Sequence, residues 1–207
     1  MAETWRLFIA TTLPPGVLTA LVEIQRALRA DTPHGVVRWV EPGSIHLTLK
    51  FLGDAPSLQR HELEDALQAA AGARPPFELS LSDLGCFPSV RRPRVVWVGL
   101  AGALPALHAL RDEIERQIAP LGYPTEDRPF SPHLTLGRVR REASSTQASA
   151  LGAQVIRTRQ HDRLAWPVTS VSLMRSELLP EGAVYTELHR VPLRATGAPP
   201  DTNEESC

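Results

Sequence analysis

The stretch Ser-Ile-His-Leu-Thr-Leu at residues 44–49 returns, with one change, as Ser-Pro-His-Leu-Thr-Leu at residues 131–136. Apolar and polar residues alternate in both copies, as they do in a β-strand with one buried and one polar face. In such a strand the histidine and the threonine, two positions apart, project to the same side. The sequence therefore predicts two related strands, each with an imidazole and a hydroxyl on its polar face. These residues are His46 and Thr48 in the first copy and His133 and Thr135 in the second.

The similarity between the two halves extends upstream of these strands. An apolar run precedes each copy, at residues 7–10 and again at residues 95–98. A Leu-Pro pair follows each run, and apolar residues then recur at three- and four-residue steps over residues 17–28 and 107–121, as in an amphipathic helix. Each half therefore follows the order strand, helix, strand, and we expect an internal repeat with approximate twofold symmetry.

Local signals predict further elements between and after the repeated segments. Ser57 precedes an apolar-periodic segment that ends near Ala71, which predicts a third helix with Ser57 as its N-cap. Alternating apolar residues predict strands at residues 77–81, 168–174 and 184–189.

Two segments have a less regular pattern. Residues 140–153 are rich in Ser, Ala and Gln and fit either a loop or a short helix. From residue 195 onward the Pro, Gly, Thr, Asp and Glu content predicts a disordered tail. We therefore expect one two-lobed α+β domain over residues 1–194, followed by a disordered tail at residues 195–207.

Composition restricts the class of protein. The 207 residues are 43% hydrophobic and 22% charged, which is ordinary for a globular chain and excludes collagen-like and wholly disordered proteins. A net charge of −1 gives no overall attraction to a polyanion, so any contact with nucleic acid must be local. No apolar stretch approaches the ~20 residues that span a bilayer. We expect no membrane association and a cytoplasmic protein. Cys86 and Cys207 lie in unrelated contexts and predict neither a disulfide framework nor a zinc site.

The repeated residue types fit chemistry at a phosphodiester. Two imidazoles that titrate near pH 7 can act as general acid and general base, and two hydroxyls can donate to phosphoryl oxygens. If the two strands face one groove, this set suits in-line displacement without a metal. Arg138 follows His133 by five residues and adds a guanidinium for the charge on phosphorus.

Three other interpretations compete with this one. Both strands could simply turn their polar residues toward water. The histidines could ligate a metal, although neither motif has a His-x-x-x-His pair or a carboxylate at a supporting offset. The fold could also bind nucleotides or RNA ends without turning them over.

The residues quoted above, together with their surroundings, resemble the 2H phosphoesterases, a family named for two His-x-Thr motifs in a duplicated fold. The resemblance is closest to the bacterial and archaeal RNA 2',3'-cyclic phosphodiesterases, also called 2'-5' RNA ligases. It implies an α+β fold with antiparallel sheets lining a central cleft and helices outside. The segments that carry it are residues 6–10, 37–53, 93–100, 120–140 and 172–178.

The resemblance also implies an activity and roles for the repeated residues. The activity is hydrolysis of a 2',3'-cyclic phosphate to a 2'-phosphomonoester, with reversible 2'-5' ligation. By similarity His46 corresponds to the acid and His133 to the base, although the sequence itself leaves their division of labour open. Thr48, Thr135 and Arg138 correspond to the phosphate-binding residues. No metal or other cofactor is expected.

The substrate beyond the phosphate ring stays open at this point. Oligonucleotide ends, tRNA halves, small cyclic nucleotides and ADP-ribose cyclic phosphate all present the same ring. Aromatic rings at Phe8, Phe51 and Trp97 could stack on a base, although core packing is the commoner role of such residues. A basic loop at residues 91–94 could steer an RNA end or merely be solvated. We take a monomer as the working expectation.

Overall fold

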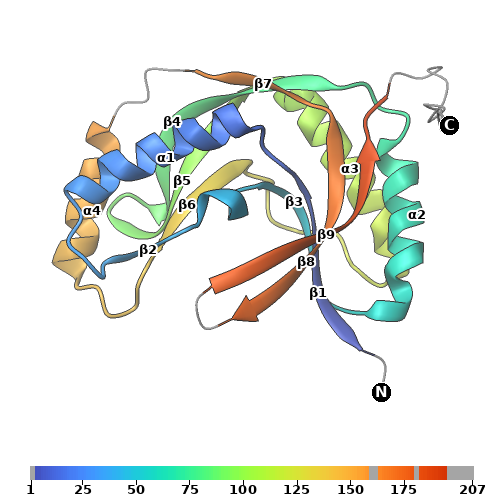
Figure 1. The fold of residues 1–207 in the computed structure, drawn as a ribbon, viewed down its shortest axis with the longest axis horizontal. Helices are drawn as coiled ribbons and strands as arrows, with labels where there is room; N and C mark the ends of the chain where they lie inside the picture. Colours follow the sequence, from blue (N-terminus) through green and yellow to red (C-terminus); the bar gives the residue numbers. More distant parts are fainter. Residues whose placement is uncertain (1–2, 159–162, 180–181, 195–207) are drawn as a thin grey trace, which may run out of the picture.

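The computed structural model describes residues 3–158, 163–179 and 182–194. Within these residues the chain forms two antiparallel sheets and four α-helices, which confirms the predicted α+β class. Figure 1 shows the helices on the outside of the molecule, with α1 and α4 on one side and α2 and α3 on the other. The predicted tail at residues 195–207 lies outside the described residues.

The two sheets differ in size by one edge strand. The first sheet has the order β3-β1-β8-β9 and the second has the order β2-β6-β5-β4-β7. The first is built from β1 (Thr4–Thr11), β3 (Leu47–Pro56), β8 (Ser170–Leu179) and β9 (Gly182–Pro192). The second is built from β2 (Val37–Trp39), β4 (Phe77–Ser89), β5 (Arg92–Gly102), β6 (His133–Val139) and β7 (Ala165–Val168).

The internal repeat is visible in these strand orders. Strands β3, β1, β8 and β9 correspond in position to β6, β5, β4 and β7. Strand β4 follows the first half of the chain but pairs with β5, and β8 follows the second half but pairs with β1. Because each half completes its sheet with a strand from the other half, neither half forms its sheet alone.

The helices are exchanged in the same way. Gln25 of α1 (Pro15–Ala30) donates to the carbonyl of Leu136 on β6, and α4 (Ser145–Arg157) packs on β4 and β5. Helix α2 (Arg60–Ala71) packs on β8 and β9 and against α3 (Leu104–Ile118), which also contacts β3. Helices α1 and α4 thus cover the second sheet, and α2 and α3 cover the first. We call the opposite face of each sheet its inner face.

Two of the predicted boundaries were wrong. Ser57 does not cap α2: residues 57–59 form a 3₁₀ turn, and α2 begins at Arg60 without a side-chain cap. The strand predicted at residues 168–174 is two strands in different sheets, because β7 ends at Val168 and β8 begins at Ser170. Val168 and Val171 are three residues apart, so the two-residue alternation breaks at this junction, and the prediction of one continuous strand overlooked that break.

Both of the alternatives left open for residues 140–153 occur: residues 140–144 form a turn, and the helix α4 follows from Ser145. The Ser144 side chain accepts from the Gln147 backbone N–H, while the Gln147 side chain accepts from the Ser144 backbone N–H, and α4 begins at the next residue, Ser145. This reciprocal pair satisfies two backbone donors that a helix N-terminus otherwise leaves without partners. It explains how a Ser- and Ala-rich segment with modest apolar content starts a helix.

A single apolar cluster runs through both sheets and contains buried side chains from all four helices in the described residues. Cys86 lies in this cluster, and burial raises the pKa of its thiol to about 11. The thiolate is therefore scarce at neutral pH, as expected for a structural cysteine. In the part of the chain that the structure describes, no helix is long and apolar enough to cross a bilayer.

A buried ion pair joins the first motif strand to α3. Lys50, the only lysine of the chain, pairs with Glu115, and both side chains are almost fully buried. The Lys50 ammonium also donates to the Pro124 carbonyl at 2.8 Å, and Arg111 contacts Glu115 at 2.9 Å. The ion pair therefore ties β3 to α3 and to the loop that leads into the second motif.

Lys50→Met is expected to lower the free energy of unfolding by about 3 kcal/mol, because it removes one of the two cations that compensate the buried Glu115 carboxylate and leaves only Arg111. Urea unfolding followed by circular dichroism measures the change. The matched control is Arg26→Ala, which breaks the exposed Arg26–Glu23 pair and should cost less than about 1 kcal/mol. Equal unfolding midpoints for the two variants would contradict this assignment.

Candidate active site

A β-bulge places the first motif on the inner face of the first sheet. Thr48 lies opposite Ala10 on β1, and Phe51 lies opposite Phe8, so the register shifts by one residue between them. Phe8 and Ala10 form a small apolar cluster separate from the main core. Thr48 and Phe51 therefore share the inner face, although an odd spacing of three would place them on opposite faces of a regular strand.

A β-bulge also occurs in the second motif strand. Thr135 lies opposite Trp97 on β5, and Arg138 lies opposite Val95, again with a register shift between the pairs. His133, opposite Gly99, is on the same side. The inner face of β6 therefore carries an imidazole, a hydroxyl and a guanidinium. In each copy the fifth residue after the histidine shares its face, and that residue is aromatic in the first copy and basic in the second.

Both imidazoles are held by the same hydrogen bond. Nδ1 of His46 lies 2.9 Å from the carbonyl oxygen of Ser44, and Nδ1 of His133 lies 2.7 Å from the carbonyl oxygen of Ser131. A carbonyl oxygen only accepts, so Nδ1 carries the proton in both rings. Nε2 of each ring is then free to accept a proton when the ring is neutral and to donate one when it is charged.

Aromatic rings from neighbouring strands fix the His46 ring in place. The Phe8 ring stacks on it with centroids 4.7 Å apart, and the Tyr185 ring meets it edge-on at 5.0 Å. Phe8 is 3% exposed, so it supports the imidazole from below. Tyr185 belongs to β9, a strand that pairs with β8 rather than with β3.

The His133 ring has a similar surround in the second sheet. The Phe87 ring of β4 meets it edge-on at 4.9 Å, and the Trp97 ring lies 6.3 Å away. Trp97 in turn lies over Gly85, where an added Cβ would come within 2.3 Å of the indole. A glycine is therefore required on β4 to let the indole lie flat beside the imidazole.

Burial lowers the pKa of both His46 and His133, and the hydrogen bonds to the Ser44 and Ser131 carbonyls oppose this shift in part. For His133 the positive charge of Arg138 lowers the pKa further. Among the described residues, no such cation contributes to the pKa of His46. Both rings of the free protein are therefore mostly neutral at pH 7, and His133 has an additional reason to be so.

The predicted stacking residues differ in what they expose. Phe8 is buried beneath His46, and Trp97 is half-buried beside His133. Phe51 has a ring that is 63% exposed on the inner face. Of the three, Phe51 offers an open ring to a ligand. Sequence reasoning missed Tyr185 and Phe87, because neither lies in a repeated motif and both reach the histidines only through long-range strand pairing.

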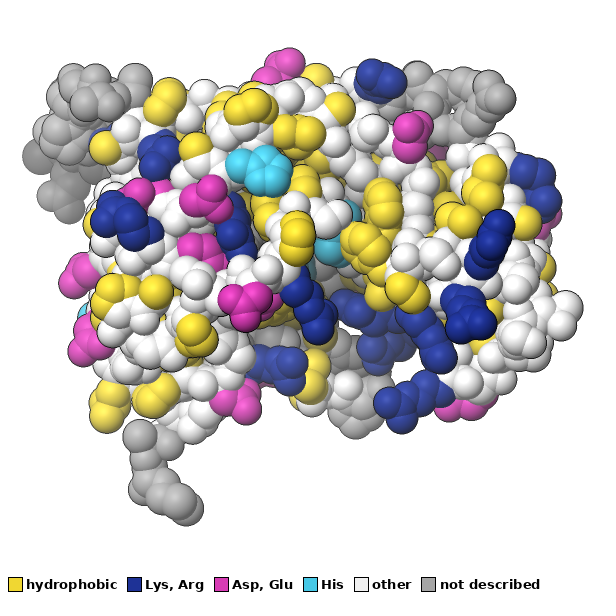
Figure 2. All heavy atoms as spheres, turned by 180° about the vertical axis from the view of Figure 1, so that it is seen from behind, with side chains coloured by type: hydrophobic (Ala, Val, Ile, Leu, Met, Phe, Trp, Pro, Cys, Tyr) yellow, Lys and Arg dark blue, Asp and Glu magenta, His cyan; other side chains and the backbone are white. Residues whose placement is uncertain are grey.

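The two motif strands come together in the middle of the molecule. β3 and β6 contact each other directly, although they belong to different sheets. Figure 2 shows a hollow between the two halves with histidine recessed in it and basic side chains gathered along one flank.

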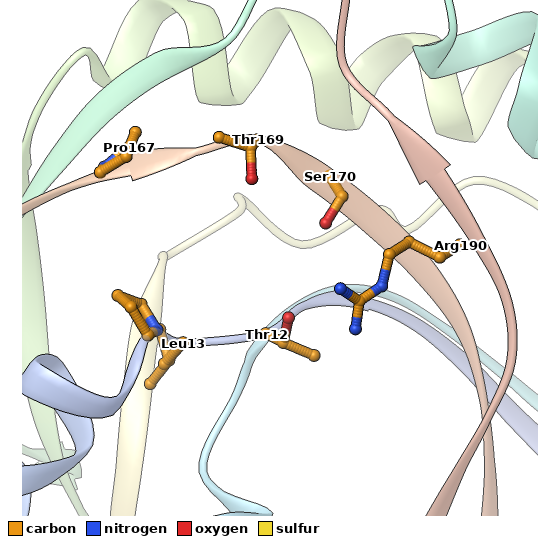
Figure 3. Close-up of a pocket in the computed structure, with 7 residues that line it drawn as sticks. Thr12, Leu13, Pro167, Thr169, Ser170 and Arg190 are labelled. Atoms are coloured by element: carbon orange, nitrogen blue, oxygen red, sulfur yellow. The ribbon is translucent and has the colours of Figure 1, made fainter. Parts of the chain in front are cut away.

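A second hollow of about 470 Å³ lies where β1 ends and β8 begins, at the end of the first sheet where Leu47 of the first motif pairs with Thr11. Its lining includes the hydroxyls of Thr12 and Ser170 and the guanidinium of Arg190, which Figure 3 shows pointing into it. Arg190 is held at 2.8 Å by Glu187, so its charge is already compensated. Among the described residues, no group of three or more His, Cys, Asp or Glu side chains is placed to hold a metal ion.

Comparisons with known proteins agree on one family. The sequence model of the 2'-5' RNA ligase superfamily matches residues 13–178. An RNA 2',3'-cyclic phosphodiesterase of Thermus thermophilus is 37% identical over 197 residues, which cover 91% of this chain and 90% of that protein. One from Methanothermobacter thermautotrophicus is 32% identical and covers 88% and 96%. The crystal structure of E. coli LigT complexed with 3'-AMP is similar with a TM-score of 0.70 and 31% identity, and covers 92% and 99%.

Arg138→Gln is expected to raise the pKa of His133, because it removes the nearby positive charge that disfavours the imidazolium. The pKa of His46 should stay as it is, since Arg138 does not act on it. A pH titration of the histidine ring signals by NMR measures both values in one sample. An equal shift of both rings, or none at His133, would contradict the proximity of Arg138 to His133.

Proposed function

Because the chain belongs to the 2'-5' RNA ligase superfamily, we propose that it is an RNA 2',3'-cyclic phosphodiesterase that opens the cyclic phosphate to a 2'-phosphomonoester. The observation that carries the proposal is the pair of imidazoles fixed through Nδ1, each with Nε2 free, on two repeated strands that come together. The 3'-AMP complex of the E. coli neighbour supports a site for a ribonucleotide monophosphate.

The reaction proceeds by in-line attack of water on phosphorus. Nε2 of His133 takes a proton from the water as its oxygen bonds to phosphorus, and the bond from phosphorus to O3' breaks. Nε2–H of His46 gives its proton to the departing O3', which leaves as the 3'-hydroxyl. The phosphate stays on O2'. Proton exchange with solvent then restores a charged His46 and a neutral His133. With a 5'-hydroxyl in place of water, the same roles give 2'-5' ligation.

Electrostatics supports this division of labour. The base must be neutral when substrate binds, and Arg138 favours the neutral form of His133. The acid must be charged, and His46 has no neighbouring cation that opposes its charge. A bound phosphate anion next to His46 favours the imidazolium and raises the pKa of this ring in the complex.

The remaining predicted residues hold the substrate in this proposal. The hydroxyls of Thr48 and Thr135 donate to the non-bridging phosphoryl oxygens, and Arg138 stabilises the charge that grows on them in the transition state. Phe51 takes the base, since its exposed ring lies on the same face as Thr48. Both half-sites come from one chain, so the proposed enzyme needs no second copy. We propose that it works as a cytoplasmic monomer, without a metal or other cofactor.

The direct test is incubation with a nucleoside 2',3'-cyclic phosphate in EDTA, with separation of the 2'- and 3'-monophosphates. The 2'-monophosphate should be the product. His46→Ala and His133→Ala should each lower kcat by ~10² or more, because general acid and general base each contribute about 10² to 10⁴. The matched control is His34→Ala, an exposed histidine outside both motifs.

Unchanged substrate with the parent protein, together with nucleotide binding that survives both substitutions, would favour a binding module instead. Activity that EDTA abolishes and added metal restores would favour a metal-dependent hydrolase.

The pH profile tests which histidine does which step. The kcat/KM profile should be bell-shaped, with the ascending limb set by the base and the descending limb by the acid in the free enzyme. Arg138→Gln should move the ascending limb to higher pH, because it raises the pKa of His133. The descending limb of kcat should lie at higher pH than that of kcat/KM, since bound phosphate stabilises the His46 imidazolium. If Arg138→Gln moves the descending limb instead, the two roles are reversed.

A further inference from the structure

A group of arginines without acidic partners lies beside the proposed catalytic centre. Arg38 on β2 is directly opposite Arg138 on β6, and Arg92 begins β5 next to the β4–β5 turn. All three are exposed. Within residues 3–158, 163–179 and 182–194, no carboxylate forms an ion pair with any of them. Two like charges directly opposite each other on neighbouring strands destabilise a sheet. The Arg38–Arg138 pairing therefore lowers the stability of the second sheet, and a role in folding does not explain why both residues are arginine.

The pairing of the strands places these three arginines on one face. Arg38 shares the face of Arg138 because directly opposed residues of an antiparallel pair point to the same side. Arg92 lies opposite Ser89, two residues beyond Phe87 on β4. Phe87 contacts His133, so Ser89 and Arg92 also belong to the inner face.

Position distinguishes these arginines from the other basic residues near the hollow. Arg138 is within reach of the reacting phosphate, while Arg38 lies one strand, ~4.8 Å, farther out, and Arg92 lies farther along β5. Figure 2 shows basic side chains gathered along one flank of the hollow, not spread around it. At the other hollow, in Figure 3, Arg190 is neutralised by Glu187. On the second sheet, positive charge that no described carboxylate pairs therefore extends from Arg138 to Arg38 and Arg92.

We propose that Arg38 and Arg92 bind backbone phosphates of the RNA strand that leads, in the 5' direction, to the terminal cyclic phosphate. This inference rests on the proposed function and assigns two side chains to the recognition of its RNA strand upstream of the reacting phosphate. A mononucleotide has no phosphate beyond the reacting one and therefore gains nothing from these two side chains. Guanidinium groups suit the role because they bind a phosphate through two parallel hydrogen bonds.

The test compares two substrates, a nucleoside 2',3'-cyclic phosphate and a pentaribonucleotide that ends in a 2',3'-cyclic phosphate. The parent protein should turn over the pentanucleotide with a kcat/KM at least about tenfold higher. That advantage should fall with salt, by a slope of ~0.7 in log kcat/KM against log salt for each phosphate bound. Arg38→Ala combined with Arg92→Ala should remove the advantage and lower the slope by ~1.4, while the mononucleotide is turned over within about twofold of the parent rate.

The matched control is the double variant Arg26→Ala and Arg116→Ala, which removes two positive charges from exposed positions on α1 and α3. It should keep the pentanucleotide advantage. Equal kcat/KM for both substrates in the parent, an advantage that survives in the Arg38 and Arg92 variant, or the same loss in the control would each overturn the inference. Absence of turnover of both substrates in the parent would instead overturn the proposed function, so the two failures are distinguishable.

Discussion

One extra residue in each motif strand determines what the inner face can do. In a regular strand the histidine and threonine would share a face, but the residue three positions after the threonine would turn into the core. The bulge on β3 brings Phe51 to the side of Thr48, and the bulge on β6 brings Arg138 to the side of Thr135. Without this shift the guanidinium would lie on the helix side of the sheet, away from the imidazole whose pKa it lowers. The catalytic set therefore depends on backbone register as much as on residue type.

The two halves share this backbone plan but use it differently. After the bulge, β6 has Gly137, where a Cβ would come within 2.6 Å of the Val37 side chain on β2. In the first sheet β3 is an edge strand without such a neighbour, and the corresponding position is Lys50, which reaches Glu115 on α3. The fifth residue after the histidine also differs between the halves: it is the exposed aromatic residue Phe51 in the first sheet and the cation Arg138 in the second. A symmetric framework thus holds an asymmetric substrate, with a base on one side and phosphate charge on the other.

The sequence predicted the repeated parts of this structure well and the exchanged parts poorly. Two copies of His-x-Thr in matched surroundings were enough to predict both motif strands, the helices before them and the shared polar face. The serine two residues before each histidine was visible as part of the repeat, but its backbone carbonyl, which fixes the ring, leaves no mark on residue type. Tyr185 and Phe87 were not predicted because they lie on β9 and β4, strands outside the repeated motifs that belong to the sheet of the other half. The junction after Val168 was missed for a different reason: the apolar residues Val168 and Val171 are three apart, and this single break in the alternation was not taken as the end of a strand.

Charge pairing explains how a nearly neutral protein can still select a polyanion. Some exposed arginines on the helices are neutralised close by, as in Arg26 with Glu23 and Arg116 with Glu113. Arg38, Arg92 and Arg138 on the inner face of the second sheet have no such partners among the described residues, so the net charge of −1 conceals a local excess beside His133. At physiological salt the field of exposed charges decays over about 8 Å. An RNA strand therefore gains binding free energy from these arginines only when its end is already in the cleft. The arginines stabilise the docked substrate and do not attract RNA over a long distance.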